Sequence, residues 1–272
     1  MKSFYLKIKR VFCKLLIFLK TPRFSFLLFQ IRYIERFVGI DTFFLSPRRL
    51  IIYFIECLYL QNHRLIKLND YGNYKLIKKK IPKNPIVYSG GVGTNITFDL
   101  DINKKNNAKV RLFDPTKNSI NFMKKYKNYK NIFFYPIALF YKNKRVKIYY
   151  DPTNRVKSNS INNFLQFNNK NFYFVDAKNL KTLIKKFKDK RIDILKLDIE
   201  GVAEDLLLHT LKNKIYPSQI VFALEIPLNY FKFLKFIKNF FYLYKVMKKK
   251  YNLYNLRSRS RGVEMEILAI KK

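Results

Sequence analysis

The sequence predicts an α/β protein with a doubly wound, mostly parallel sheet over residues 86–272. Short apolar runs alternate there with segments of helical period, a pattern typical of a sheet covered by helices on both faces. Three of the seven glycines lie directly after the first of these runs, at the kind of strand end where such a sheet binds its ligand. Residues 1–85 lack this alternation and are expected to form a helical N-terminal extension that ends in a linker.

The expected strands are short runs rich in β-branched, aliphatic and aromatic residues, bounded by polar or turn residues. In chain order they cover residues 86–89, 110–113, 132–135, 146–150, 192–197, 219–224, 251–254 and 263–270. The last two are expected to end the chain as a hairpin-like pair. Between the fourth and fifth strands, the Asn-rich segment 151–171 is expected to form a loop over the carboxyl edge of the sheet.

The expected helices lie in the intervals between these strands and cover residues 94–105, 116–126, 180–187, 203–211 and 231–247. Thr94 and Thr116 are the expected N-caps of the first two, because a threonine hydroxyl can accept a hydrogen bond from a free N–H of the first helical turn. Helices that alternate with strands in this way cover both faces of a parallel sheet.

The N-terminal extension is basic and rich in apolar residues. Residues 1–70 show the pattern of helical segments, and the basic, proline-containing stretch Lys75–Lys83 is the expected linker. The apolar stretch Val11–Ile31 is interrupted by basic residues and a proline, so no run reaches the ~18 uncharged residues of a transmembrane helix. We expect a cytoplasmic protein whose extension docks on the core or contacts an anionic membrane surface.

The net charge of +38 is spread along the chain and is not concentrated in one segment. Specific nucleic-acid recognition usually requires a basic patch or stripe, so nucleic acid is the least favoured partner. The two cysteines, Cys13 and Cys57, cannot form a disulfide framework, and the two histidines, His63 and His209, stand far apart. The sequence therefore predicts neither a disulfide scaffold nor a structural zinc site.

The glycine-rich loop after the first strand contains Gly90, Gly91 and Gly93. Glycines allow a tight turn and let a ligand approach the backbone. The helix that follows offers free N–H groups at its N-terminus to a polar or negatively charged ligand. The alternative interpretation is a plain tight turn with no ligand.

Asp114 ends the second strand, about 20 residues after the glycine loop, where an acidic residue can accept hydrogen bonds from a ribose. A dinucleotide site would place a third glycine three residues after Gly93, and Ile96 holds that position. This favours a nucleoside cofactor without a pyrophosphate, such as S-adenosylmethionine, over NAD or FAD.

A third motif, Asp193–Gly201, places Asp198 and Glu200 at the end of the predicted strand 192–197. In a doubly wound sheet these carboxylates would border the same crevice as the glycine loop. Glu225 ends the next strand in the same way. The alternative is that Asp198 and Glu200 only cap the following helix, where negative charge favours the helix dipole.

Three ordered segments, Val87–Gly93 with Phe98-Asp99, Leu112–Thr116 and Asp193–Gly201, resemble the FkbM-type methyltransferase family over roughly residues 86–226. The resemblance implies a Rossmann-like, seven-stranded methyltransferase fold with S-adenosylmethionine as methyl donor. It also implies O-methylation of a hydroxyl, often on a glycan or natural product. The expected acceptor is therefore a glycan or another small molecule.

By the same resemblance, the glycine loop would hold the amino-acid part of the cofactor, Asp114 its ribose, and Ala138 would lie near its adenine. Many methyltransferases carry an acidic residue just before the glycine loop, whereas here Tyr88-Ser89 holds the place. The cofactor's amino group would then be met by Asp99, by Asn95 or by backbone atoms alone.

A hydroxyl acceptor needs a general base, and neither histidine lies in a motif, so a carboxylate is expected in this role. Asp198 is the first choice, Glu200 the second and Glu225 the third. No metal ligands are assigned, although carboxylates at such a crevice could instead bind a divalent ion. The alternative function is a non-catalytic relative of the same fold. Such a protein would bind membranes or nucleic acid through its basic N-terminal region.

Overall fold

The computed structural model describes residues 47–150, 152, 160–161, 170–227, 230–256 and 264–272. Expectations for residues 1–46, including the interrupted apolar stretch, lie outside this range. The chain forms two compact units, Met1–Tyr53 and Phe54–Lys272, and helix α3 (Pro47–Tyr59) runs across the boundary between them. Among the described helices, none has the length and apolar character needed to cross a membrane.

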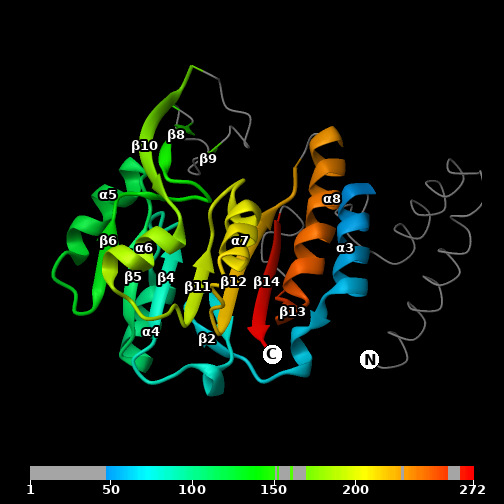
Figure 1. The fold of residues 1–272 in the computed structure, drawn as a ribbon, viewed down its shortest axis with the longest axis horizontal. Helices are drawn as coiled ribbons and strands as arrows, with labels where there is room; N and C mark the ends of the chain where they lie inside the picture. Colours follow the sequence, from blue (N-terminus) through cyan, green and yellow to red (C-terminus); the bar gives the residue numbers. More distant parts are fainter. Residues whose placement is uncertain (1–46, 151, 153–159, 162–169, 228–229, 257–263) are drawn as a thin grey trace, which may run out of the picture. The chain divides into compact units, whose positions relative to one another are not determined.

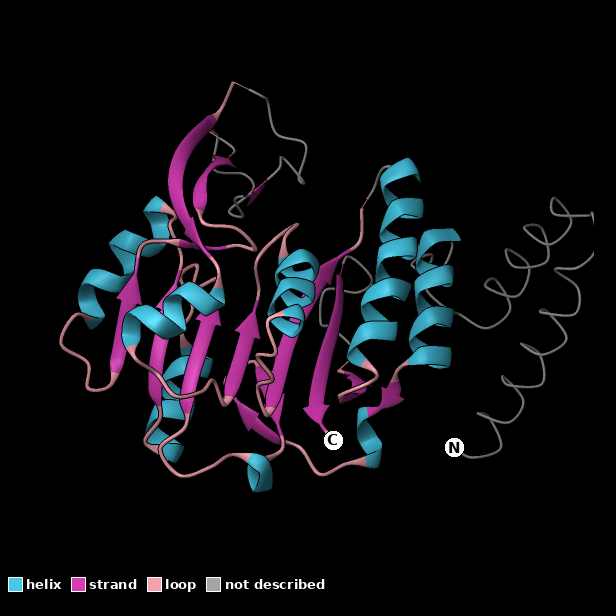
Figure 2. Ribbon diagram, viewed as in Figure 1, coloured by secondary structure: helices cyan, strands magenta, loops and turns pink. Residues whose placement is uncertain are grey.

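The second unit is built around an eight-stranded sheet (Figures 1 and 2). The strand order is β1-β13-β14-β12-β11-β4-β5-β6. The bounds are β1 Gln61–Asn62, β4 Ile86–Gly90, β5 Lys109–Phe113, β6 Ile132–Tyr135, β11 Ile194–Leu197, β12 Gln219–Glu225, β13 Tyr251–Asn255 and β14 Glu264–Lys271. All pairings among these strands are parallel except the two made by β14. The predicted doubly wound, seven-stranded α/β fold is thereby confirmed, with the two-residue β1 added at one edge.

The order of the strands determines where a ligand can bind. From β4 the chain moves outward through β5 to β6, and it then returns to place β11 on the other side of β4. The carboxyl ends of β4 and β11 therefore meet at the point where the winding direction reverses. Open parallel sheets bind ligands at such a point, because the connections leave a crevice there.

Among the described residues, five α-helices lie wholly within this unit: α4 (Thr97–Asn106), α5 (Lys117–Met123), α6 (Leu180–Phe187), α7 (Ala203–Lys212) and α8 (Tyr230–Met247). The expected cap of α5 is confirmed, since the Thr116 hydroxyl accepts a hydrogen bond from Ser119 N. The expected cap of α4 at Thr94 is wrong. This helix begins three residues later, because the Asn95 side chain accepts the hydrogen bond from Thr97 N and closes a local turn first.

A second, four-stranded sheet with the order β7-β10-β8-β9 lies above the carboxyl edge of the main sheet (Figure 1). Its strands are β7 (Ala138–Leu139), β8 (Lys144–Tyr149), β9 (Ser160–Ile161) and β10 (Phe172–Lys178). The predicted strand at 146–150 therefore exists, but it belongs to this sheet. Most of the expected loop 151–171 lies outside the described residues, but residues 160–161 form β9 and are not loop. Neither β7 nor β10 was predicted.

The residues just before β4 also differ from the prediction. Residues 61–71 form no α-helix: they form β1, the short 3-10 helix η2 (His63–Leu65) and β2 (Asn69–Tyr71), and β2 pairs with β3 (Tyr74–Leu76). Tyr71, Tyr74 and Leu76 belong to the same hydrophobic core cluster as Val87 and Ile102. This hairpin, β2–β3, is therefore an integral part of the core.

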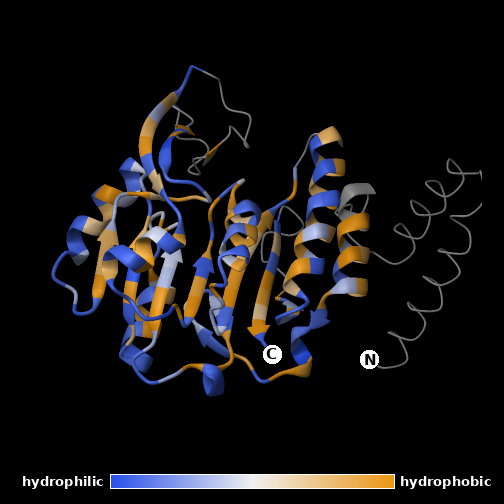
Figure 3. Cartoon of the chain, viewed as in Figure 1, coloured by the Kyte–Doolittle hydropathy of each residue, from blue (hydrophilic) through white to orange (hydrophobic). Residues whose placement is uncertain are grey.

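Apolar residues fill both faces of the main sheet, and β12 and β14 are largely apolar along their length (Figure 3). On one face, Val87 of β4 shares a cluster with Phe98 and Ile102 of α4. On the other face, the ring of Tyr88 lies 6.4 Å from the ring of Phe187 at the end of α6. Successive residues of β4 thus pack against helices on opposite sides, as expected for a central parallel strand.

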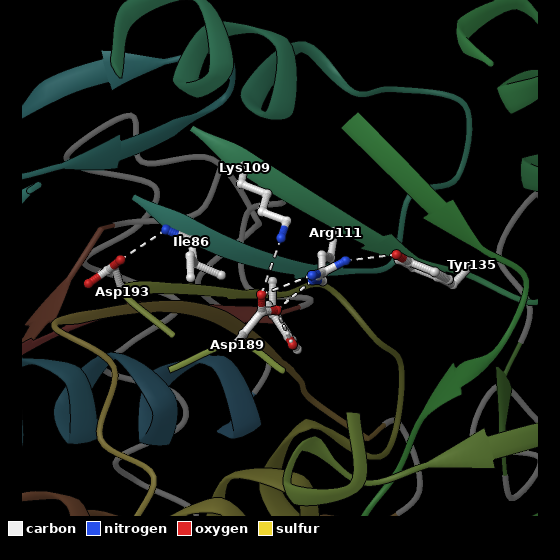
Figure 4. A network of polar contacts seen from close by, with 7 residues as sticks. Ile86, Lys109, Arg111, Tyr135, Asp189 and Asp193 are labelled. Atoms are coloured by element: carbon white, nitrogen blue, oxygen red, sulfur yellow. Dashed lines mark hydrogen bonds and ion pairs between the residues drawn. The ribbon is translucent and has the colours of Figure 1, made fainter. Parts of the chain in front are cut away.

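A buried polar network links β4, β5 and β6 to the turn before β11 (Figure 4). Asp189, in the turn between α6 and β11, accepts hydrogen bonds from Arg111 Nη2 at 2.9 Å and from the Tyr88 hydroxyl at 2.8 Å. Arg111 also donates to the Tyr135 hydroxyl of β6 at 2.8 Å. Burial by itself raises the pKa of Asp189, but the Arg111 and Tyr88 hydrogen bonds outweigh it and lower the pKa below its ordinary value.

Replacing Arg111 by Met should strongly destabilise the fold, because it leaves Asp189 buried without its main cationic partner. The expected loss is about 3–5 kcal/mol in the free energy of unfolding, measured by urea denaturation at neutral pH. Lys109→Met is the matched control, since Lys109 contacts the same carboxylate at 3.4 Å but its side chain is 42% exposed. Its loss should stay below about 1 kcal/mol.

The sign of the pH dependence follows from the lowered pKa of Asp189. The stabilisation by Arg111 is complete above the ordinary carboxyl pKa, and it is lost as the pH falls through the lower pKa of the folded state. The difference between wild type and Arg111→Met should therefore shrink in acid. Equal losses in the two variants at neutral pH would contradict this assignment.

Candidate functional site

The main cavity of the described residues has a volume of about 410 Å³ and opens at the carboxyl ends of β4, β5 and β11. Its walls come from the loops that follow these strands, from β7 and β8 of the small sheet, and from the β2–β3 hairpin. The cavity therefore occupies the crevice where the strand order predicts a ligand. Several parts of the chain that are distant in sequence meet in it.

The glycine loop forms one wall, and its glycines serve different purposes. Gly91 has a φ of +80°, and a Cβ on it would lie 1.8 Å from the carbonyl oxygen of Asp198. Gly93 has a φ of +54°, and a Cβ there would have no described atom within 4 Å. Gly90 ends β4 and does not line the cavity. The backbone of Asp198 thus already requires glycine at position 91, whereas position 93 faces open space.

Asp114 lines the cavity and holds the glycine loop in place. Its Oδ2 accepts hydrogen bonds from Val92 N and Gly93 N, both at 2.9 Å, and its Oδ1 accepts one from Thr116 N at 2.8 Å. An ionised carboxylate has about four acceptor positions, so one remains for a hydroxyl group in the cavity. The structure therefore brings the two predicted cofactor motifs into direct contact.

Of the other predicted cofactor residues, two line the cavity and one does not. Ala138 and Asn95 line the cavity, and Asn95 also binds Thr97 N. Asp99 is fully buried and does not line it. Burial raises the pKa of the Asp99 carboxyl to about 6, against the opposing effect of the Lys196 ammonium.

Lys196 is a cavity residue that was not predicted. It lies in the middle of β11, is only 3% exposed, and donates a hydrogen bond from Nζ to the carbonyl oxygen of Gly91 at 2.9 Å. The same ammonium lies 5.1 Å from the centroid of the Tyr74 ring. The sequence feature that could have indicated its role is a lysine inside an otherwise apolar run, Ile194–Leu197, that predicts a buried strand. Lysines are rarely buried without a partner.

Asp198 and Glu200 both line the cavity just beyond the end of β11. Asp198 Oδ2 accepts a hydrogen bond from the Tyr74 hydroxyl at 2.7 Å, and Asp198 N donates to Gly90 O at 3.0 Å. Burial and the Asp198 carboxylate raise the pKa of Tyr74, so its hydroxyl stays protonated and remains a donor. Tyr74 was not predicted, because it belongs to the segment expected to be an N-terminal extension.

Glu225 lines a different cavity, of about 290 Å³, between α7, α8 and the end of β12. It still lies near enough to Glu200 and Asp198 for their charges to help raise its pKa. Its Oε2 accepts a hydrogen bond from Gly201 N at 3.1 Å. Burial raises the pKa of Glu225 to about 8 and that of Glu204, in the same cavity, to about 7. Among the described residues, no group of three or more His, Cys, Asp or Glu side chains is arranged to hold a metal ion.

Sequence comparison identifies the family. The family model described as the methyltransferase FkbM domain matches residues 91–242, more than half of the chain. The chain therefore belongs to the FkbM methyltransferase family, as the three motifs predicted. No curated protein sequence matches it.

Solved structures with a similar course of the chain have low sequence identity. One is the fibrillarin pre-rRNA processing protein of Methanococcus jannaschii, with 8% identity, coverage of 75% of this chain and 82% of that chain, and a TM-score of 0.40. A second is M. capricolum TrmK in complex with S-adenosylhomocysteine, with 13% identity, coverage of 71% of this chain and 65% of that chain, and a TM-score of 0.35. A third is a predicted O-methyltransferase of Agrobacterium tumefaciens, with 10% identity, coverage of 70% of this chain and 74% of that chain, and a TM-score of 0.35. At these scores the similarities support no argument about function.

The two glycines with positive φ provide a matched pair of substitutions. Gly93→Ala should cost about 1–2 kcal/mol in the free energy of unfolding, the penalty for left-handed backbone in a residue with a Cβ. Gly91→Ala adds a collision with the Asp198 carbonyl, so its loss should be at least about twice as large. Chemical denaturation of both variants measures the difference. Equal losses would mean that the backbones of Gly91 and Asp198 do not lie in contact.

Proposed function

We propose that this protein transfers a methyl group from S-adenosylmethionine to a hydroxyl group of a glycan or another small-molecule acceptor. The observation that carries the proposal is the composition of one cavity. It joins the glycine loop and Asp114, suited to a nucleoside, with Asp198 and Glu200, suited to proton removal. Membership of the FkbM methyltransferase family supports the same reaction class.

The residues present fit S-adenosylmethionine. Asp114 keeps one acceptor position for a ribose hydroxyl, and the open space at Gly93 leaves room beside the glycine loop. Ala138 and Phe113 provide an apolar wall for an adenine ring. The cavity also carries the carboxylates of Asp198 and Glu200, which suit a ligand with a sulfonium and an ammonium group. When bound, S-adenosylmethionine would supply a methyl group that is already electrophilic.

The protein would mainly contribute orientation and removal of one proton. Asp198 is the preferred base. Its Oδ2 accepts a hydrogen bond from the Tyr74 hydroxyl, which fixes the direction of the carboxylate. Among the described residues no donor binds Oδ1, which could then accept the proton of the acceptor hydroxyl. Glu200 lines the same cavity two residues further along and is the second choice. Glu225 lies in the second cavity, so it is the least favoured base.

Binding of S-adenosylhomocysteine tests the cofactor assignment. Asp114→Ala should weaken binding by about 1–3 kcal/mol, because a ribose hydroxyl and two loop N–H groups lose their acceptor. Titration calorimetry measures the affinity, and Asp176→Ala, on the exposed face of β10, is the control that should bind like the wild type. Binding of NADH in place of S-adenosylhomocysteine by the wild-type protein would refute the assignment.

The base assignment requires a paired measurement of cofactor affinity and methyl transfer. Asp198→Asn should lower the transfer rate by about 10²–10⁴-fold, because the amide cannot accept the proton. It should lower cofactor affinity far less, because the carboxylates of Asp114 and Glu200 remain in the cavity lining. Glu200→Gln should have a smaller effect. Transfer is measured with labelled methyl donor and a panel of glycan and small-molecule acceptors.

Three outcomes of this experiment are informative. Normal transfer in both variants would exclude Asp198 and Glu200 as bases and direct attention to Glu225. Loss of cofactor binding in Asp198→Asn would instead mean that this carboxylate holds the donor. Wild-type cofactor binding without transfer to any acceptor of the panel would favour the alternative of a non-catalytic relative of this fold.

A further inference from the structure

The charges that line the main cavity contrast with those of the whole chain. The chain has a net charge of +38, yet Lys196 is the single positively charged side chain among the described residues that line this cavity. Three carboxylates, those of Asp114, Asp198 and Glu200, share the lining with it. For a ligand that carries one carboxylate and cationic groups, Lys196 is the one cationic side chain of this lining that can pair with the carboxylate.

Lys196 is also an unusual residue for a central parallel strand. A buried ammonium loses much of its hydration and needs partners in exchange. It has three donor hydrogens, and the described contacts of its Nζ are one hydrogen bond to Gly91 O and the face of the Tyr74 ring. Asp99 lies near enough for the Lys196 charge to affect its ionisation, but no hydrogen bond joins the two groups. The ammonium therefore retains capacity to bind an anionic group.

The first turn of α4 is the other place that could receive a carboxylate, because free N–H groups and the helix dipole attract anions. The turn of the β2–β3 hairpin lies against it. A Cβ on Gly72 would lie 2.4 Å from Phe98 N, and Gly72 N donates to Asp101 Oδ2 at 2.9 Å. Asn73 also accepts a hydrogen bond from the Thr97 hydroxyl at 2.6 Å. The hairpin thus occupies space in front of the helix, which leaves Lys196 as the better anion partner.

We propose that the Lys196 ammonium binds the carboxylate at the amino-acid end of the bound cofactor, while it holds the Gly91 carbonyl of the glycine loop. This inference rests on the proposed function, because it takes an S-adenosyl amino acid as the ligand. It assigns a binding role to a residue of β11, on the opposite side of β4 from Asp114. The two ends of the cofactor would then be recognised by different halves of the sheet.

A double cycle of protein and ligand tests the contact. Wild type and Lys196→Met are each titrated by calorimetry with S-adenosylhomocysteine and with its decarboxylated form, which keeps the amino group. For S-adenosylhomocysteine, Lys196→Met should lower the affinity by about 10- to 100-fold, the range for losing a hydrogen bond to a charged group. For the decarboxylated ligand the affinity should change by less than about 3-fold or improve, because no anion remains to be bound.

Two control variants separate this contact from general effects. Lys117→Met removes a charge at the start of α5, outside the cavity lining, and should leave both affinities as in the wild type. Lys196→Arg retains the charge and should recover part of the affinity for S-adenosylhomocysteine. If Lys196→Met fails to fold, the two ligands are compared on the wild-type protein. The decarboxylated ligand should then bind about 10-fold more weakly or worse.

The results discriminate between the inference and the proposed function. An equal loss for both ligands in Lys196→Met would overturn the inference, because Lys196 would then only maintain the glycine loop. In that case wild-type binding of S-adenosylhomocysteine would still support the proposed function. If the wild-type protein binds neither ligand, the proposed function itself is wrong and the inference falls with it.

Discussion

The close approach of two backbones, at Gly91 and at Asp198, is the constraint on which the site depends. The Asp198 carbonyl occupies the space of a Cβ at position 91, and Asp198 N donates to Gly90 O. The loops after β4 and β11 are therefore locked together at the switch point of the sheet. Because of this contact, the Asp114 side and the Asp198 side of the cavity have a fixed separation, which the proposed group transfer would require.

Polar groups that the fold needs and polar groups that a ligand would need are largely the same groups. Asp114 organises the glycine loop through Val92 N and Gly93 N and still faces the cavity. Lys196 holds the Gly91 carbonyl, and Tyr74 directs Asp198. Such shared roles mean that substitutions here combine structural and binding effects, so paired ligands or paired readouts are required to separate them.

Much of the architecture could be predicted from local patterns. Features that depend on neighbouring residues were predicted correctly. They include the main-sheet strands from Ile86 onward, the Thr116 cap and the order of the three motifs. The β2–β3 hairpin could not be predicted in this way, because Tyr71 and Tyr74 are buried by packing against α4, which is distant in sequence. Likewise β10 is defined by its pairing with β8. Lys196 and Tyr74 were missed as site residues because their roles arise from contacts between distant segments.

The central claim is that one cavity holds an S-adenosyl ligand between the glycine loop and the end of β11. A crystal structure of the protein with S-adenosylhomocysteine tests it most directly. The account predicts ribose hydroxyls at Asp114, adenine beside Ala138 and the amino-acid end between Gly91 and Lys196. It would be contradicted by a ligand bound elsewhere, for example in the second cavity at Glu225, or by a ligand whose ribose lies away from Asp114.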